Sequence, residues 1–510
     1  MQSSGLLNAV QAAFARGISR LVQWPAWSAF GLLGLLFGVY LYTNSYSRFY
    51  YDAGSYWYLA GRYWASGQFH FQSFDSSLRG YLFPLLLSPL FRVASHWAGA
   101  PIALTRALGL GTAAALFGVV GPALWQALSA CPTQTVSLGR RLLFGLLGFG
   151  LWRGYFNFPL TDFPALLLLL SGLWAGLRGR SVVSGLLAGL AVAAAANFRP
   201  IYVAALPLAA GLCLWPHWSN AAGPQPDLIR WARGLAFGVG MCLVMAPQLF
   251  INQVHFGVTS PLVLTARPNE PNLYFALVHT GLYFQKYETN VGTDYPTAQV
   301  FFADAEGRSL LSKMKQAPPA TAAQHLRTAG TYSVALLRLL MRHAFNGLDV
   351  QYPTPYVQKV YTPSWGLAPA NYTVIITGFF VLLRLAWRRH TRASIPAGLV
   401  LLAILAPCAA LLPVVMECRF LMPLQLLLCA AVAFDTSPLR SWRAASTARR
   451  ATGALLYGGM LLACFAASSS TQRQLVGKPR LLFDWQKTAA QPEAGSRGGN
   501  LLSEPAGTNL

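Results

Sequence analysis

This sequence is poor in charge, and acidic residues are the scarcest of its charged residues. Charged side chains make up 10% of the 510 residues and hydrophobic residues 55%. Soluble globular proteins carry about 25% charged residues. The composition therefore excludes a soluble protein and predicts an integral membrane protein. The seven cysteines show no CxxC or other paired spacing, so we expect neither a disulfide framework nor a cysteine metal site.

Motifs for nucleotides and metals are also missing. The chain has no Walker loop and no GxGxxG after a strand, and its eight histidines show no HxxxH-like spacing. We therefore expect no cofactor, and the possibility of a divalent metal stays open. No internal repeat is visible, whereas transporters are often built from repeated halves.

What the sequence does have is a series of apolar runs. A bilayer span needs about 20 mostly apolar residues, and the chain offers about eleven candidates. They centre near 26–43, 102–126, 142–154, 162–178, 183–197, 200–215, 233–252, 369–387, 395–414, 418–434 and 452–468. The predicted fold class is an all-α polytopic membrane protein with about 11 transmembrane helices.

The distribution of charge predicts the orientation of these spans. The net charge of +23 comes mainly from basic residues in short loops, which the positive-inside rule places in the cytoplasm. The spans then alternate correctly if 81–98 lies along the membrane surface. On this map only Asp227 and Asp435, of fifteen acids, fall inside. We predict a bacterial inner-membrane protein with its active site facing the periplasm; an endoplasmic reticulum protein would show a similar pattern.

The same map divides the chain into four parts. We expect an N-terminal transmembrane catalytic module at 1–252, whose first outer loop is 44–101 and whose first span is an uncleaved signal anchor. A large, Pro-bearing outer loop at 253–368 would form a mixed cap over the bundle. The C-terminal transmembrane helices would occupy 369–468, followed by a polar, disordered outer tail at 469–510.

A single acid stands out in the first outer loop. The stretch "SRFYYDAGSYWYLAGRYW" (47–64) surrounds Asp52 with aromatic rings. It predicts an amphipathic helix on the outer leaflet with Asp52 at its N-cap, where helix amides would keep the carboxylate ionised, as a general base requires. The simpler interpretation is a plain helix cap in an interfacial aromatic belt.

Four other charged residues lie at the predicted outer ends of apolar segments. Arg79 precedes a Gly-Tyr turn in "SSLRGYLFPLLLSPLFRV", and Asp162 stands in "LTDFP". Arg199 lies in "NFRPIYV" and Arg419 in "ECRFLMP". An arginine at headgroup depth can bind a phosphate bidentately. The alternatives are an arginine snorkelling to lipid, an N-cap at Thr161 or Asp162, and a simple Glu417–Arg419 pair.

These motifs, in this order and on one side of the membrane, resemble the GT-C class of membrane glycosyltransferases. The chain is similar to the branch with the protein O-mannosyltransferases and the aminoarabinose transferases of lipid A, over roughly 25–435. The resemblance implies a bundle of 11–13 spans, with interfacial helices and a catalytic acid in the first outer loop. It also implies sugar transfer from a polyprenyl-phosphate donor to an acceptor on the outer face.

The resemblance assigns roles to individual residues. Asp52 matches the first-loop acid and Asp162 the acid of the "TD" turn. Arg79 matches the basic residue before the "GY" turn, which approaches the lipid phosphate in relatives. Arg199 and Arg419 match the outer-turn positions "RP" and "E-x-R-[FY]", and we expect all three arginines to bind the donor phosphate. Aromatic rings would line the sugar or lipid path: Tyr50, Tyr51, Tyr56, Trp57 and Tyr81.

Two departures weaken the match to protein mannosyltransferases. Ala53 stands where many of them carry a second acid, and 253–368 contains no recognisable acceptor-binding module. The acceptor could therefore be a glycolipid, a glycan or a protein. The hypothesis is an inverting glycosyltransferase whose donor is a lipid-phosphate sugar. We expect no nucleic-acid partner. The alternatives are a glycan ligase or polymerase with a lipid-diphosphate donor, and a lipid or glycan transporter.

Overall fold

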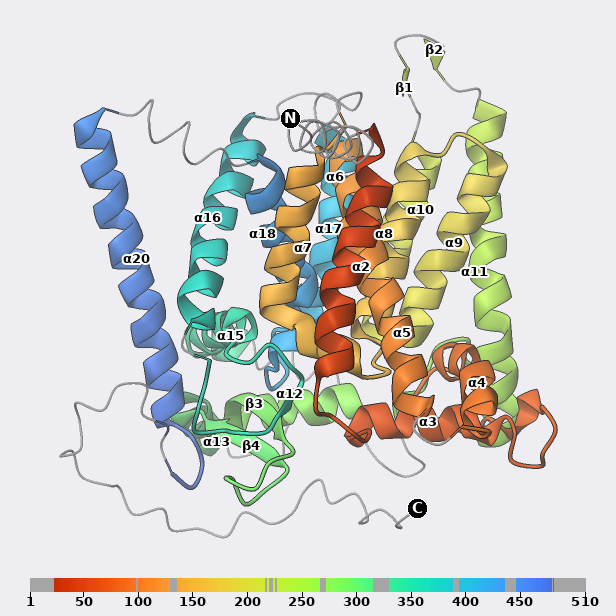
Figure 1. The fold of residues 1–510 in the computed structure, drawn as a ribbon, viewed down its shortest axis with the longest axis horizontal. Helices are drawn as coiled ribbons and strands as arrows, with labels where there is room; N and C mark the ends of the chain where they lie inside the picture. Colours follow the sequence, from red (N-terminus) through yellow and green to blue (C-terminus); the bar gives the residue numbers. More distant parts are fainter. Residues whose placement is uncertain are drawn as a thin grey trace, which may run out of the picture.

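The computed structural model shows a bundle of long helices with a mixed helix and strand layer at one end (Figure 1). It describes residues 23–97, 100–128, 135–215, 218–219, 223–224, 227–266, 272–314, 330–364, 366–388, 394–435, 446–478 and 480. We call the end that carries this layer, at the bottom of Figure 1, the site end.

The helices of the bundle stand side by side, roughly along one direction (Figure 1). They are α2 (Pro25–Thr43), α5 (Ala100–Ala115), α6 (Gly121–Leu128), α7 (Leu138–Trp152), α8 (Asp162–Arg178), α9 (Val182–Phe198), α10 (Leu206–Leu214), α11 (Asp227–Phe256), α16 (Leu367–Arg388), α17 (Ser394–Leu411), α18 (Met422–Asp435) and α20 (Thr447–Arg473). One turn of π-helix, η2 (Leu116–Val120), joins α5 to α6. Short 3-10 turns lie at helix ends: η3 (Arg153–Asn157), η4 (Pro200–Ala205) and η5 (Cys418–Leu421).

Six of these helical segments are long and apolar enough to cross a membrane. They are Pro25–Thr43, Ala100–Leu128, Asp227–Phe256, Leu367–Trp387, Cys418–Asp435 and Thr447–Arg473. The protein is thus a mainly helical, polytopic membrane protein, as its composition predicts. The other five predicted spans are also helices, but shorter or less apolar ones. The count of eleven spans therefore stays a prediction.

Small residues let α9 approach α11 closely. A Cβ atom on Gly189 of α9 would lie 2.1 Å from the carbonyl oxygen of Phe237, and one on Gly240 of α11 would lie 2.4 Å from that of Leu186. Membrane helices associate through van der Waals contact, since lipid is as apolar as their own side chains, and small residues bring the backbones together. This contact holds α9, whose last turn leads into the candidate site.

The site end is built from short elements that lie across the bundle. The first loop supplies α3 (Tyr51–Arg62), η1 (Phe71–Ser73) and α4 (Leu82–Ala94), and α3 lies nearly perpendicular to the bundle (Figure 1). The later segment supplies α12 (Leu273–Tyr283), β3 (Phe284–Asn290), β4 (Gln299–Ala303), α13 (Ala305–Met314), α15 (Ser333–Leu348) and β5 (Tyr356–Val357). At the opposite end, β1 (Trp218–Ser219) pairs with β2 (Gly223–Pro224).

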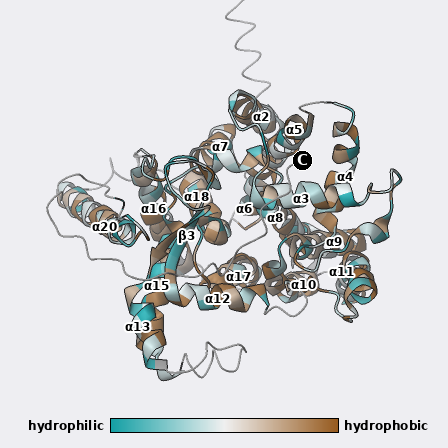
Figure 2. Cartoon of the chain, turned by 90° about the horizontal axis from the view of Figure 1, so that it is seen from below, coloured by the Kyte–Doolittle hydropathy of each residue, from teal (hydrophilic) through white to brown (hydrophobic). Residues whose placement is uncertain are grey.

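The segment predicted as an outer cap contains a small sheet. Its strands lie in the order β4-β3-β5, with β3 antiparallel to β4 and parallel to β5. Seen from the site end, β3 and α13 carry hydrophilic residues, whereas α10 and α11 are largely hydrophobic (Figure 2).

The predicted start of the disordered tail, at residue 469, is wrong. Helix α20 continues past residue 468 to Arg473, and the backbone beyond it bonds to β4, with Val476 N–H donating to Phe301 O at 2.9 Å. The buried Arg480 donates to Gln351 Oε1 at 2.9 Å and also contacts Tyr352. These polar contacts fix a segment whose composition alone indicates disorder. Residues 481–510 lie outside the described residues.

The contact between α9 and α11 gives a first prediction. Gly189→Ala places a methyl group against the Phe237 backbone, so we expect it to lower the free energy of unfolding by about 1–3 kcal/mol. The matched control is Gly238→Ala on α11, whose Cβ would meet open space. Because alanine favours helix, this control should be neutral or stabilising by up to about 1 kcal/mol. Thermal unfolding in detergent would compare them, and equal effects would contradict the close contact.

Candidate functional site

Charged residues from five separate segments meet at the site end. Asp52 lies in the first turn of α3, Arg79 in the loop before α4, Asp162 at the start of α8, Arg199 just after α9, and Arg419 in η5. The structure brings all five predicted charged residues into one cluster. Glu417 joins them.

The cluster is held by direct ion pairs. Arg79 Nη2 lies 2.5 Å from Asp52 Oδ1, and Arg199 pairs with Asp162. Arg419 stands between the two acids, because its Nη1 is 3.1 Å from Asp52 Oδ2 and 3.9 Å from Asp162 Oδ2. The two acids therefore share one guanidinium, and each has a second arginine of its own.

Arg419 is oriented from its other side by Glu417. Its Nε donates to Glu417 Oε2 at 2.7 Å, and the Tyr287 hydroxyl of β3 donates to the same oxygen at 2.6 Å. Burial raises the pKa of Glu417, and the neighbouring Arg419 partly offsets this effect. The predicted Glu417–Arg419 pair is present, but it is one part of the larger cluster.

Exposure falls steeply across the cluster. The side chains of Asp52 and Arg79 are 27% and 28% exposed, whereas those of Asp162 and Glu417 are 3% and 5% exposed. A ligand entering from outside therefore reaches Asp52 and Arg79 first. The six groups carry three formal positive and three formal negative charges, which is the compensation that buried ions require.

The position of Asp52 differs from the one predicted. The N-cap of α3 is Tyr50, and Asp52 is the second residue of the helix. The predicted N-cap position is therefore wrong, although Asp52 does lie in the first turn of the helix. Burial by itself would raise the pKa of Asp52, but Arg79 and then Arg419 outweigh burial and lower that pKa to about 2. Guanidinium groups, rather than a cap, keep this carboxylate charged.

The loop that carries Arg79 is anchored to the bundle through Gly80. A Cβ at this position would lie 2.0 Å from the carbonyl oxygen of Asn197, so only glycine lets the loop pass the end of α9. The next turn bonds to the same residue, as Leu82 N–H donates to Asn197 Oδ1 at 3.0 Å. Asn197 Nδ2 in turn donates to Gln248 Oε1 of α11 at 3.0 Å. The buried amides thus fix Arg79 relative to Arg199.

The predicted aromatic lining divides into two groups. Arg79 lies over the Tyr56 ring, 5.5 Å from its centroid, while Tyr50 and Tyr51 are the two residues before Asp52 in the chain. Trp57 instead packs against Phe49 and Phe91, and Tyr81 is buried with its hydroxyl donating to Val244 O at 3.0 Å. Trp57 leaves α3 about 140° around the helix axis from Asp52. Trp57 and Tyr81 therefore lie away from the charged cluster, and their predicted place on the sugar or lipid path stays a prediction.

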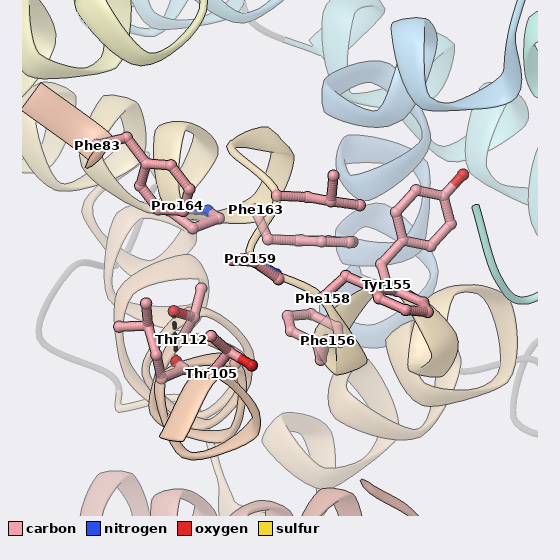
Figure 3. Close-up of a pocket in the computed structure, with 12 residues that line it drawn as sticks. Phe83, Thr105, Thr112, Tyr155, Phe156, Phe158, Pro159, Phe163 and Pro164 are labelled. Carbon is pink, nitrogen blue, oxygen red and sulfur yellow. Dashed lines mark hydrogen bonds between the residues drawn. The ribbon is translucent and has the colours of Figure 1, made fainter. Parts of the chain in front are cut away.

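An apolar pocket lies next to the cluster, between α4, α5, η3 and α8 (Figure 3). Its lining includes Phe83, Phe158, Phe163 and Pro164, with Thr105 and Thr112 on one wall. Phe83 packs edge-on against Tyr56, with 5.2 Å between the ring centroids. The pocket wall therefore adjoins the charged cluster, because Phe163 follows Asp162 in the chain and Phe83 packs against the ring beneath Arg79.

Four residues that position the cluster are not predicted from the sequence. They are Asn197, Gln248, Tyr287 and Tyr356. A signal existed for Asn197 and Gln248, because a lone amide in an apolar run needs a buried partner. Thr161 does not cap α8 with its side chain; its hydroxyl instead lies 3.3 Å from that of Tyr56. Tyr287 and Tyr356 bond to residues more than 100 positions away in the chain, so no local sequence pattern could reveal their roles.

In the parts of the chain that the structure describes, no group of three or more His, Cys, Asp or Glu side chains is arranged to hold a metal ion. The six cysteines in those parts are free thiols. No protein-family model, curated protein or solved structure matches this chain. The site has therefore to be interpreted from its own chemistry.

The pKa of Asp52 gives a prediction about stability. Its native pKa of about 2 lies below the unfolded value of about 3.9, so ionised Asp52 stabilises the fold above about pH 4. This contribution is lost as the pH falls from about 4 to about 2. We expect Asp52→Asn to be less stable than the wild type at pH 6, with a difference that shrinks below pH 4. Chemical denaturation in detergent measures it.

The matched control is Asp75→Asn in the same loop. Asp75 pairs with Arg62 at 2.6 Å, but its side chain is 44% exposed. Exposed pairs contribute about 0–1 kcal/mol, so the control should have little effect at pH 6. A difference between Asp52→Asn and the wild type that stays constant from pH 6 to pH 2.5 would contradict the prediction.

Proposed function

We propose that the protein is an integral membrane glycosyltransferase that moves a sugar from a polyprenyl-phosphate donor to an acceptor hydroxyl. The observation that carries the proposal is the cluster in which two acids share three arginines at the end of an apolar bundle. Arginines suit a lipid phosphate, and a carboxylate suits a hydroxyl acceptor. The proposal places this end at the periplasmic face of a bacterial inner membrane.

In the proposed reaction Asp52 is the general base. The acceptor oxygen attacks the anomeric carbon while its proton passes to the Asp52 carboxylate. The bond between the sugar and the phosphate oxygen breaks, and the configuration inverts. Exposure favours Asp52 over Asp162 for this role, because Asp162 is nearly enclosed behind it. Asp162 instead keeps Arg199 and Arg419 in place.

The arginines that bind the phosphate must leave the acids at least in part. Arg79 is both the most exposed arginine of the cluster and the direct partner of Asp52. A donor phosphate that draws Arg79 and Arg419 toward itself removes positive charge from Asp52. The pKa of Asp52 then rises from about 2 and the carboxylate becomes a stronger base. Donor binding and activation of the base are thereby coupled.

Two other functions remain as alternatives. A ligase or polymerase with a lipid-diphosphate donor could use the same cluster, and identification of the donor lipid separates it from the proposal. A transporter would move a lipid or glycan without making a bond. Transporter sites lie near the middle of the membrane, whereas this cluster lies where helices begin and end. A transport assay with Asp52→Asn would distinguish the two.

The first test of the proposal is Asp52→Asn. Loss of the base should lower transfer by about 10²–10⁴-fold, and the folded protein should still be recovered from membranes. The measurement is glycolipid and cell-envelope analysis of a strain that lacks the protein and is complemented with each variant. We expect a polyprenyl-phosphate sugar to accumulate while one decoration is missing. Asp75→Asn is the matched control and should restore the decoration; undiminished transfer by Asp52→Asn would overturn the role of Asp52.

The second test concerns the phosphate. Arg79→Gln removes the exposed guanidinium, so the apparent KM for the donor should rise by at least tenfold while the acceptor KM changes little. Arg62→Gln is the control, because Arg62 forms the equivalent exposed ion pair with Asp75 in the same loop. The assay varies the donor concentration with purified protein in detergent. An unchanged donor KM would place the phosphate elsewhere.

A further inference from the structure

The hydroxyl of Tyr356 joins both ends of the turn that begins α3. It donates to the carbonyl oxygen of Tyr50 at 2.8 Å and accepts the N–H of Ala53 at 3.3 Å. The same two backbone groups close the turn directly, with Ala53 N–H donating to Tyr50 O at 2.9 Å. Asp52 lies inside this turn. Ala53 and Tyr356 are buried, at 0% and 3% exposure, so water is a poor substitute for the hydroxyl.

The turn needs such support because its backbone is strained. Tyr51, the residue before Asp52, has φ +39°, in the left-handed region that a bulky side chain rarely adopts. Conformations of this kind cost about 1–3 kcal/mol and persist only where surrounding contacts hold them. Two such contacts come from outside α3: the hydroxyl of Tyr356, and the carbonyl oxygen of Asn290, which accepts the Tyr51 hydroxyl at 3.1 Å.

Both contacts come from the small sheet at the site end. Tyr356 belongs to β5 and Asn290 ends the neighbouring strand β3, where Thr289 pairs with Tyr356. The Tyr356 ring packs edge-on against Phe158, with 4.7 Å between centroids. Burial and the nearby Asp52 raise the pKa of Tyr356, so its hydroxyl keeps the proton that it donates.

We propose that Tyr356 is a positioning residue for Asp52: strand β5 holds the strained first turn of α3 and so aims the carboxylate at Arg79 and Arg419. The segment between α11 and α16 is then part of the catalytic framework in addition to forming a cap. The effect on sugar transfer rests on the proposed function. The effect on the first turn of α3 does not.

The test is Tyr356→Phe, which removes the hydroxyl and keeps the ring. The matched control is Tyr352→Phe, four residues earlier in "VQYPTPYVQ", where another buried tyrosine donates its hydroxyl to Val360 O at 2.6 Å. Hydrogen–deuterium exchange is measured on the full chain in detergent. Tyr356→Phe should speed exchange at the start of α3 by at least fivefold and leave α15 and β3 unchanged. Tyr352→Phe should leave α3 unchanged.

Transfer kinetics supply the second readout, with the polyprenyl-phosphate sugar that accumulates in the deletion strain as donor. A misdirected carboxylate should lower kcat by about 10–100-fold while the donor KM stays within twofold, since the arginines remain. If exchange of α3 is unchanged in Tyr356→Phe, or rises equally throughout the chain, the positioning role is overturned. If exchange rises locally but the wild type transfers no sugar, the proposed function fails and the support of α3 stands.

Discussion

Arg419 lies between three carboxylates with its side chain 14% exposed, and the arrangement of the site end depends on this one guanidinium. A charge in such a place is tolerated only when opposite charges and hydrogen bonds compensate it. Asp52, Asp162 and Glu417 provide them at 3.1, 3.9 and 2.7 Å. These acids come from α3, α8 and the chain just before η5. The first loop, the bundle and the C-terminal helices are therefore tied together at one point.

The segment between α11 and α16 contacts this cluster in two places. The Tyr287 hydroxyl of β3 fixes the carboxylate that orients Arg419, and Tyr356 of β5 holds the turn that carries Asp52. Since β3 and β5 are hydrogen-bonded neighbours, both ends of the Asp52–Arg419 ion pair are fixed by one sheet. A movement of this sheet would change the distance between acid and arginine. The segment 253–368, which its composition predicts only as a cap, therefore also holds residues of the site in position.

The bundle and the charged cluster could be predicted from the sequence, whereas most of the residues that hold the cluster in place could not. Apolar runs and loop charges are local properties, so helices such as α2 and α11 followed from them, and so did the convergence of Asp52, Arg79 and Arg419. The cause of Asp52 ionisation did not follow, because it depends on distances across the fold. Trp57 shows the same limit: it is five residues from Asp52 in the sequence, but it packs against Phe49 and Phe91 and not against the cluster.

The balance of charge in the cluster bears on how a phosphate could bind. The six groups carry three positive and three negative charges, so the cluster has no excess positive charge. It is therefore not expected to bind a phosphate strongly through net charge alone. A phosphate must compete with carboxylates for the same guanidiniums, and Asp52, the more exposed acid, is the one that it can displace. On the proposed mechanism, this competition makes the acid a useful base only when the donor is present. On this mechanism the ion cluster would have two effects. It would stabilise the fold when no donor is bound, and it would allow the transfer reaction only after the donor has bound.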